Sequence, residues 1–233
     1  SKTLCLRSLA HLTGPVIGGL REQRDGLDRL AEAEELMAIY ARNAELLADG
    51  PNRGDLFYFD PHTKEYTGQL KVLKGWCGRR HGVVKALNLD TFHTRSGRPC
   101  FIAHYSPYYD LRERFFLSRV RFDQLFDEDQ RQGRTFVIDR GIYSLPVLQS
   151  FAPDYIITWE KGYQGGGWDE QAPTIAFSRT RPRNCHDDLR TIHFECQEAP
   201  WRRDRSFRRI LMRLRREGEE PIELSVVTSH PHM

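Results

Sequence analysis

Apolar residues recur every three or four positions between residues 20 and 48, and this spacing predicts an amphipathic helix. Asp49, Gly50 and Pro51 form the turn signal that ends it. Because only one side of the helix is apolar, we expect it to pack on a sheet; the alternative is a seam between two copies of the chain. The apolar positions are Leu27, Leu30, Ala33, Met37, Tyr40, Ala44 and Leu47.

Downstream of residue 50 the pattern changes to short apolar runs separated by turn-forming residues, which predicts strands. Five such runs lie before residue 163, at residues 56–62, 83–94, 100–106, 135–141 and 154–162. Two helices are expected among them, at residues 110–126 and 144–151. This order predicts an α/β fold with a mixed sheet, because parallel neighbours need helical crossovers.

Beyond residue 162 the sequence predicts further strands, separated by charged or proline-bearing turns. They are expected at residues 174–181, 191–198, 207–216 and 222–229. The third of these also fits a helix face, but Gly218 and Pro221 before a β-branched run favour a hairpin. The chain therefore divides into an N-terminal helical segment of residues 1–50, a core of residues 51–162 and a C-terminal β-rich insertion of residues 163–233.

Composition narrows the class of protein. The 233 residues are 39% hydrophobic and 29% charged, which is typical of a globular chain that can bury a core. The sequence has no apolar run of bilayer length and no signal peptide, so we expect a cytoplasmic protein without a membrane partner. The five cysteines are scattered and lack a CxxC pair, which favours reduced thiols over a disulfide framework.

Positive charge is locally concentrated, although the net charge is only +3. Between Trp201 and Arg216 the only acidic residue is Asp204, which is typical of a surface that faces a polyanion; the alternative is a solvated arginine-rich face. A second basic group surrounds Trp76. Both groups are candidate contacts for double-stranded DNA, because arginine and lysine neutralise phosphates and release counterions. The candidates are Lys71, Lys74, Arg79, Arg80, Arg208, Arg209 and Arg213.

Two aspartates end apolar strands: Asp60 in LFYFDPH and Asp139 in FVIDRG. A carboxylate that closes a buried strand is costly unless something compensates it, and an arginine or a helix N-terminus is a common structural compensation. Two carboxylates brought together would instead begin a Mg²⁺ or Mn²⁺ site, because hard cations prefer oxygen ligands. Each aspartate is therefore a candidate metal ligand and catalytic residue.

Three segments of the chain resemble the DDE-type transposases of bacterial insertion sequences. They are FYFDPHTKEYTGQLKVLKGWCGRRHG, FHTRSGRPCFIAHYSPYYDLRERF and FVIDRGIYSLPVL, and the resemblance extends from about Gly54 to Lys161. It implies a ribonuclease-H-like mixed sheet flanked by helices, in which the ends of the first and fourth strands lie side by side.

The same resemblance implies roles for individual residues. Asp60 and Asp139 become the first two catalytic acids, and Arg140 and Tyr143 hold DNA beside them. Relatives with a β-rich insertion carry the third acid on a later helix, in a signature of Tyr, Arg and Glu that is missing here. We expect this glutamate beyond the end of the chain, with Glu160 as the fallback inside it.

The chain begins at Ser1 without methionine and ends at Met233 before an element closes, so we expect a fragment that is inactive by itself. As a whole, the resemblance implies a transposase that hydrolyses a phosphodiester at the ends of its element and joins the freed 3′ end to target DNA. It further implies Mg²⁺ or Mn²⁺ as cofactor, double-stranded DNA as partner, a dimer in the DNA complex and association with a bacterial nucleoid.

Three alternatives stay open at this point. One is a nuclease of the same fold, and another is an inactive, truncated transposase that only binds DNA. The third is a zinc site, which is disfavoured because the spacing of its ligands matches no familiar finger. Its candidate ligands are Cys185, His186, His193 and Cys196.

Overall fold

The structure is a computed structural model, and it describes residues 56–231 apart from residues 70, 96, 183–188, 202 and 217. The chain divides into two compact units, and all of the described residues belong to the second, Leu47–Met233. The predicted helix of residues 20–48 and the N-terminal segment of residues 1–50 lie outside the described residues.

The aromatic run LFYF establishes two different faces of the sheet. Strand β1 (Leu56–Glu65) buries Phe57 and Phe59, whereas Tyr58 is half-buried and Asp60 is exposed. This alternation is the period of two that a strand imposes on its side chains. We call the side of Phe57 and Phe59 the inner face, and the side of Tyr58 and Asp60 the open face.

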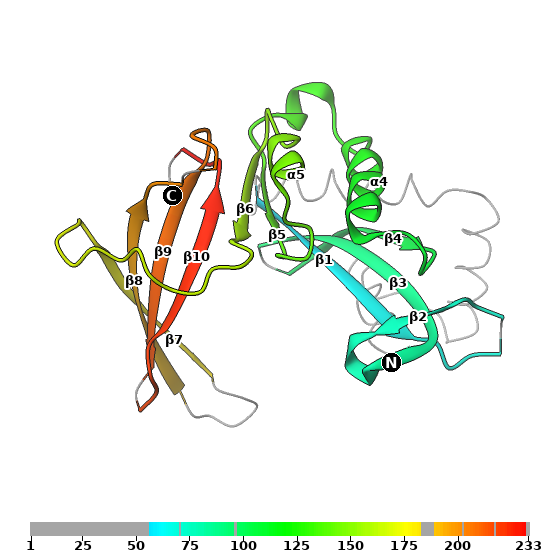
Figure 1. Cartoon of the computed structure of the whole chain (residues 1–233). Coiled ribbons are helices and arrows are strands. Elements are labelled where there is room, and N and C mark those ends of the chain that lie inside the picture. Colours follow the sequence, from blue (N-terminus) through cyan, green and yellow to red (C-terminus); the bar gives the residue numbers. More distant parts are fainter. Residues whose placement is uncertain are drawn as a thin grey trace, which may run out of the picture. The chain divides into compact units, whose positions relative to one another are not determined.

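The described residues form one mixed sheet of ten strands (Figure 1). After β1 the elements are β2 (Lys74–Cys77), η1 (Gly78–Arg80), β3 (Gly82–Thr94), β4 (Pro99–Tyr105), α4 (Leu111–Asp123), η2 (Glu128–Arg131), β5 (Thr135–Ile138), α5 (Leu145–Gln149), β6 (Tyr155–Trp159), β7 (Ile175–Pro182), β8 (Leu189–Ala199), β9 (Arg208–Arg216) and β10 (Ile222–Thr228). The strand order is β2-β3-β1-β5-β6-β10-β9-β8-β7, and β4 pairs with β3. Strand β5 is parallel to both of its neighbours, β1 and β6, while β10 runs antiparallel to β6.

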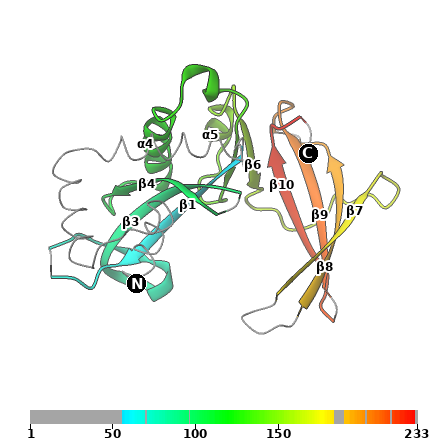
Figure 2. The same ribbon diagram turned by 180° about the vertical axis from the view of Figure 1, so that it is seen from behind.

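Phenylalanines join the two α-helices to the inner face. Phe122 of α4 stacks on Phe92 of β3, with ring centroids 4.4 Å apart. Phe151, just after α5, stacks on Phe115 of α4 at 5.4 Å. Both views show α4 and α5 side by side (Figure 2). The described helices therefore cover the inner face and leave the open face to other contacts.

The predicted strands and helices of the core are found in the structure, with shifted bounds. Strand β5 ends at Ile138, so Asp139 lies one residue beyond it. Strand β2 was not predicted, because four residues around Gly75 and Trp76 carry too weak an apolar pattern. Residues 207–216, which also fitted a helix face, form strand β9 between two antiparallel neighbours.

The prediction of a sheet flanked by helices is not supported. Among the described residues only two α-helices occur, and the fold is a mostly β mixed sheet. The reason lies beyond residue 162, where the described elements are all strands and β10 joins them to the sheet by pairing with β6. The predicted division at residue 162 stays a prediction, and strands from both of its sides belong to one sheet. No helix of the described part is both long and apolar enough to cross a bilayer.

Candidate active site

Asp60 and Asp139 reach the same level on neighbouring parallel strands. Tyr58 of β1 is paired with Val137 of β5, and each aspartate lies two residues further along its own strand direction. Adjacent strands lie about 4.8 Å apart, and we expect a similar separation of the two Cα atoms if the spacing continues two residues beyond the last pair. A step of two residues also keeps both side chains on the open face, where both are exposed.

The two carboxylates form no ion pair with any described residue. The Asp139 carboxylate accepts a hydrogen bond from the backbone N–H of Arg140 at 2.7 Å. Two neighbouring carboxylates disfavour each other's charge, so a cation placed between them is favoured. Mg²⁺ usually takes one or two carboxylates and completes its shell with water and phosphate oxygens. The donor set therefore fits the ion that the sequence predicts, and the ion itself stays a prediction.

The described residues supply no third ligand next to this pair. No group of three His, Cys, Asp or Glu side chains among them lies close enough to hold a metal ion. The fallback residue, Glu160, already has partners: its carboxylate accepts from Trp201 Nε1 (3.1 Å) and Ser225 Oγ (2.7 Å), and pairs with Arg209 Nε (3.0 Å). Glu160 lies just beyond the end of β6 and lines the same cavity as Asp139, but its carboxylate is held by these three partners. These contacts favour a structural anchor over a metal ligand.

A cavity of about 320 Å³ opens beside Asp139. Arg140 is exposed there and forms no ion pair within the described part of the chain, so it can meet an anion. Trp159 is 42% exposed, although tryptophan is usually well buried. The cavity is lined by Asp139, Arg140, Trp159, Glu160, Tyr163, Glu223, Leu224 and Ser225.

Tyr143 does not lie where a DNA contact requires it. The side chain is 6% exposed, and burial raises the pKa of its hydroxyl. The neighbouring Arg203 guanidinium opposes this rise in the pKa of Tyr143. Tyr143 is thus a core residue, and the prediction that it contacts DNA directly is corrected by its burial.

The arginines predicted from the β9 run are neutralised inside the sheet. Arg208 forms a two-pronged pair with Glu198, with Nε 2.8 Å from Oε1. Arg213 Nε lies 2.9 Å from Glu223 Oε1, and Arg209 binds the anchoring glutamate described above. The run itself contains a single acid, but its neighbours β8 and β10 supply carboxylates across the strands. The three arginines are therefore paired with carboxylates of the sheet, and their predicted contact with DNA stays a prediction.

The basic group around β2 keeps its charge at the surface. Trp76 is 62% exposed. Arg80 pairs with Glu65 through Nε and Oε2 at 2.6 Å, whereas the remaining cations form no ion pair with a described residue. Those exposed cations are Lys71, Lys74 and Arg79. This group is the part of the predicted DNA surface that is free to meet phosphates.

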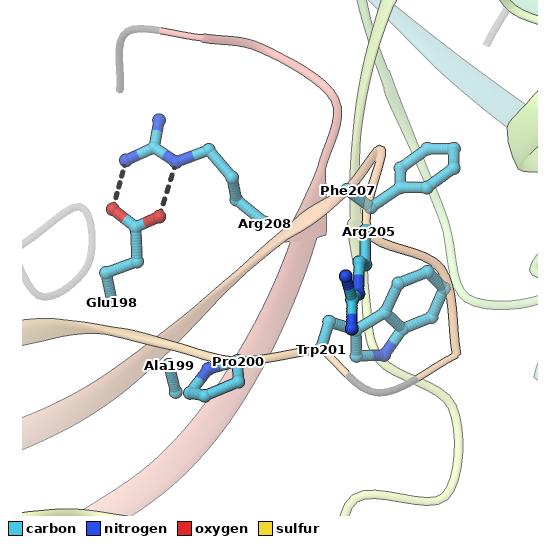
Figure 3. A pocket seen from close by; sticks show the side chains of 7 residues that line it. All are labelled: Glu198, Ala199, Pro200, Trp201, Arg205, Phe207 and Arg208. Atoms are coloured by element: carbon cyan, nitrogen blue, oxygen red, sulfur yellow. Dashed lines mark hydrogen bonds and ion pairs between the residues drawn. The ribbon is translucent and has the colours of Figure 1, made fainter.

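A cavity of about 590 Å³ lies at the connection between β8 and β9 (Figure 3). Two buried rings line it, and Trp201 meets Phe207 edge to face with centroids 5.5 Å apart. Its single acidic side chain, Glu198, is held by Arg208, as the dashed lines in Figure 3 show. The cavity therefore lacks an acid or base that is free for catalysis.

The zinc alternative gains no support from the described residues. Cys185 and His186 lie outside them. His193 is hydrogen-bonded through Nδ1 to Ser178 Oγ at 2.8 Å, and Cys196 is half-buried in β8.

Comparison with known proteins leaves the family open. No protein-family model matches the chain, and no curated protein matches it. Among solved structures, the chain is similar to the piggyBac transposase in a cryo-EM structure of its synaptic complex with hairpin DNA, with a TM-score of 0.43 and 8% sequence identity. The match covers 77% of this chain and 34% of the other, so this chain spans about a third of that protein's length. A likeness this distant identifies neither a family nor an activity.

Proposed function

We propose that this chain is the catalytic part of a DDE-type DNA transposase with a ribonuclease-H-like core. One observation carries the proposal: Asp60 and Asp139 stand at the same level on parallel neighbours β1 and β5, exposed on one face and without a described counter-charge. A catalytic metal site gives a reason for this arrangement, because paired carboxylates without a cation repel each other.

The strand order supports the proposed core. The first and fourth strands of the predicted core, β1 and β5, are adjacent and parallel, with β3 and β4 on one side and β6 on the other. Asp60 lies within β1, which continues to Glu65, and Asp139 directly follows β5. The resemblance to transposases implies that these two acids are neighbours in space.

The residues of the chain would act on a DNA strand laid across this edge. Asp60 and Asp139 would hold Mg²⁺ or Mn²⁺, and such ions activate an attacking oxygen and stabilise a leaving one in phosphodiester chemistry. Arg140, next to Asp139, would bind a neighbouring phosphate, and the exposed cations Lys71, Lys74 and Arg79 would bind more distant ones.

The test uses the full-length natural protein and DNA that carries the ends of its element. The substitutions D60N and D139N keep the shape of each side chain and remove a metal-binding charge. With Mg²⁺, each should reduce strand cleavage by a factor on the order of a thousand, and the double variant should lose little more, because the two residues act as a unit. DNA affinity should stay within about twofold, because phosphate contacts by cations supply it.

A matched control is E220Q, which removes an exposed carboxylate from the turn between β9 and β10. It should cleave like the wild type. Cleavage at wild-type rates by D60N or D139N would overturn the proposal. Cleavage by the wild type without joining to target DNA would instead support the nuclease alternative.

A further inference from the structure

Trp159 continues the row that the two aspartates begin. Ile138 of β5 is paired with Thr158 of β6, so Asp139 and Trp159 follow at the same level, one residue beyond that pair. Asp60, Asp139 and Trp159 therefore stand side by side on three adjacent parallel strands. At about 4.8 Å per strand, the Trp159 Cα lies about 5 Å from that of Asp139 and about 10 Å from that of Asp60.

The indole of Trp159 is not used by the described structure in the way that those of Trp168 and Trp201 are, and of the two exposed tryptophans, Trp76 and Trp159, it is the one beside Asp139. Trp201 is 6% exposed and donates its N–H to Glu160, and the ring of Trp168 carries the Arg213 guanidinium at 4.2 Å. Trp159 has neither a ring partner nor a hydrogen bond from its indole among the described residues, and 42% of it is exposed.

The backbone beneath this ring is held firmly. The residue after it, Glu160, donates its backbone N–H to the Ser225 carbonyl at 2.8 Å. The Glu160 side chain is fixed by three further groups on β9, β10 and the β8–β9 connection. An exposed aromatic ring on a rigid strand end is a preorganised contact surface, since little freedom is lost when a ligand covers it.

We propose that Trp159 is a stacking platform for an unpaired DNA base next to the phosphate held at Asp60 and Asp139. The inference rests on the proposed function and names a substrate feature: a single-stranded or frayed segment at the site. Every base offers a π-face for an aromatic side chain, but in a duplex both faces are covered by neighbouring bases. The cavity beside Asp139 holds the matching groups, with Arg140 for a phosphate and Trp159 for a base.

The spacing defines which base is involved. The 5–10 Å between the aspartates and Trp159 corresponds to at most about three nucleotides at the rise of a stacked strand, about 3.4 Å each, and to fewer in an extended strand. The stacked base therefore lies within three nucleotides of the phosphate that is cleaved. Side chains alternate between the two faces of a strand, so a ring one residue earlier in β6 would point to the inner face. Stacking at this site therefore requires the aromatic side chain at position 159.

The experiment measures binding of a short fluorescein-labelled oligothymidylate to the whole protein by anisotropy, without divalent metal, and compares it with a duplex of equal length. W159L keeps an apolar side chain and removes the π-face, so it should weaken single-strand binding by about 5- to 150-fold. W159F should stay within about threefold of the wild type. The matched control Y108L removes a 77% exposed ring elsewhere and should change neither affinity. Duplex binding should be equal for all four proteins.

Replacing the thymines by abasic sugars provides a second readout. The abasic strand should bind the wild type as weakly as W159L binds the intact strand, and W159L should lose nothing further. Wild-type affinity of W159L for the intact strand, or an equal loss on duplex, overturns the inference, as does a W159F that is as weak as W159L. Those outcomes leave the cleavage test of D60N and D139N untouched, so the two proposals fail separately. Equal unfolding temperatures of the variants confirm that each one folds.

Discussion

The charged residues at the two ends of the parallel strands β5 and β6 differ in burial and in ion pairing. At the starting end, Arg134 directly precedes β5 and Asp154 directly precedes β6, and both are buried. Arg134 Nη2 lies 2.8 Å from Asp154 Oδ2, and Arg119 and Asp123 complete a balanced group of two cations and two anions. At the finishing end, Asp139 is exposed and has no described counter-charge.

The charges at the starting end stabilise the fold through buried ion pairs, whereas the exposed Asp139 at the finishing end is accessible to a ligand. A buried charge is stable only when it has a partner of opposite charge, and at the starting end each of the four charges has one. The finishing end leaves the Asp139 carboxylate exposed and without a charged partner among the described residues. Sequence alone presents Asp154 and Asp139 alike, as acids that flank apolar strands.

The largest effect on stability is expected from breaking the closed group at the starting end. D154A leaves the buried guanidinium groups of Arg119 and Arg134 without their shared anion. Removing one partner of a buried pair costs about 3–5 kcal/mol. Urea unfolding should show this loss, while E220A, an exposed acid, should change the free energy of unfolding by no more than about 0.5 kcal/mol. A loss below 1 kcal/mol for D154A would mean that water reaches the group.

Asp90 of β3 provides an intermediate case, because it is fully buried and paired only loosely. Its Oδ1 lies 3.3 Å from Arg114 Nη2, and neither carboxylate oxygen has a hydrogen-bond partner within the described part of the chain. Burial raises the pKa of Asp90 to about 6, against the lowering effect of Arg114. The folded state therefore holds the Asp90 proton more tightly than the unfolded state does.

This difference predicts the sign of a pH dependence. The stabilisation linked to the Asp90 proton is complete below about pH 4 and is lost as the pH rises through about 6, because the folded state then has to carry a buried charge. The shift of about two pKa units corresponds to about 3 kcal/mol. The free energy of unfolding of the wild type relative to D90N should fall by this amount between about pH 4 and pH 7 in urea titrations. A rise over this range would contradict the assignment of burial as the dominant cause.

The smallest effect on the free energy of unfolding is expected from replacing Asp139 at the finishing end. The size of this effect depends on whether a divalent metal ion is present. Without divalent metal, D139N should change the free energy of unfolding by no more than about 0.5 kcal/mol, because the side chain is exposed. Mn²⁺ at a hundred times its Kd should stabilise the wild type by about 2.7 kcal/mol and leave D139N unchanged. Thermal unfolding with increasing Mn²⁺ measures both, with E220Q as the variant that should respond like the wild type. Equal stabilisation of D139N would place the ion elsewhere.

Much of the core could be predicted because its signals are local. The run LFYF alternates along β1, and FVI before Asp139 gives β5, so both strands and the acids that follow their apolar runs were found in the sequence. The short helix α5 follows from its Ser144 cap, which accepts from the Val147 N–H, with Pro146 in its first turn.

The candidate site could be predicted only in part, because its decisive features are pairings across strands. The run around Arg208 and Arg213 has the composition of a DNA surface, yet acids on β8 and β10 neutralise it. Glu160 looked like a possible ligand until its three partners were placed around it. Trp159 was missed, because nothing in TWEKG reveals which strand will lie beside it.

The sequence by itself determined which segments form most of the strands, which side chains alternate, and that two acids follow apolar runs, since these depend on propensity and period within a few residues. The tertiary structure alone decided that β5 pairs with β1 in the register that levels Asp139 with Asp60, and that Asp154 is closed off while Asp139 stays open. Register and burial arise from contacts between segments far apart in the chain, where a shift of one residue turns every side chain to the other face.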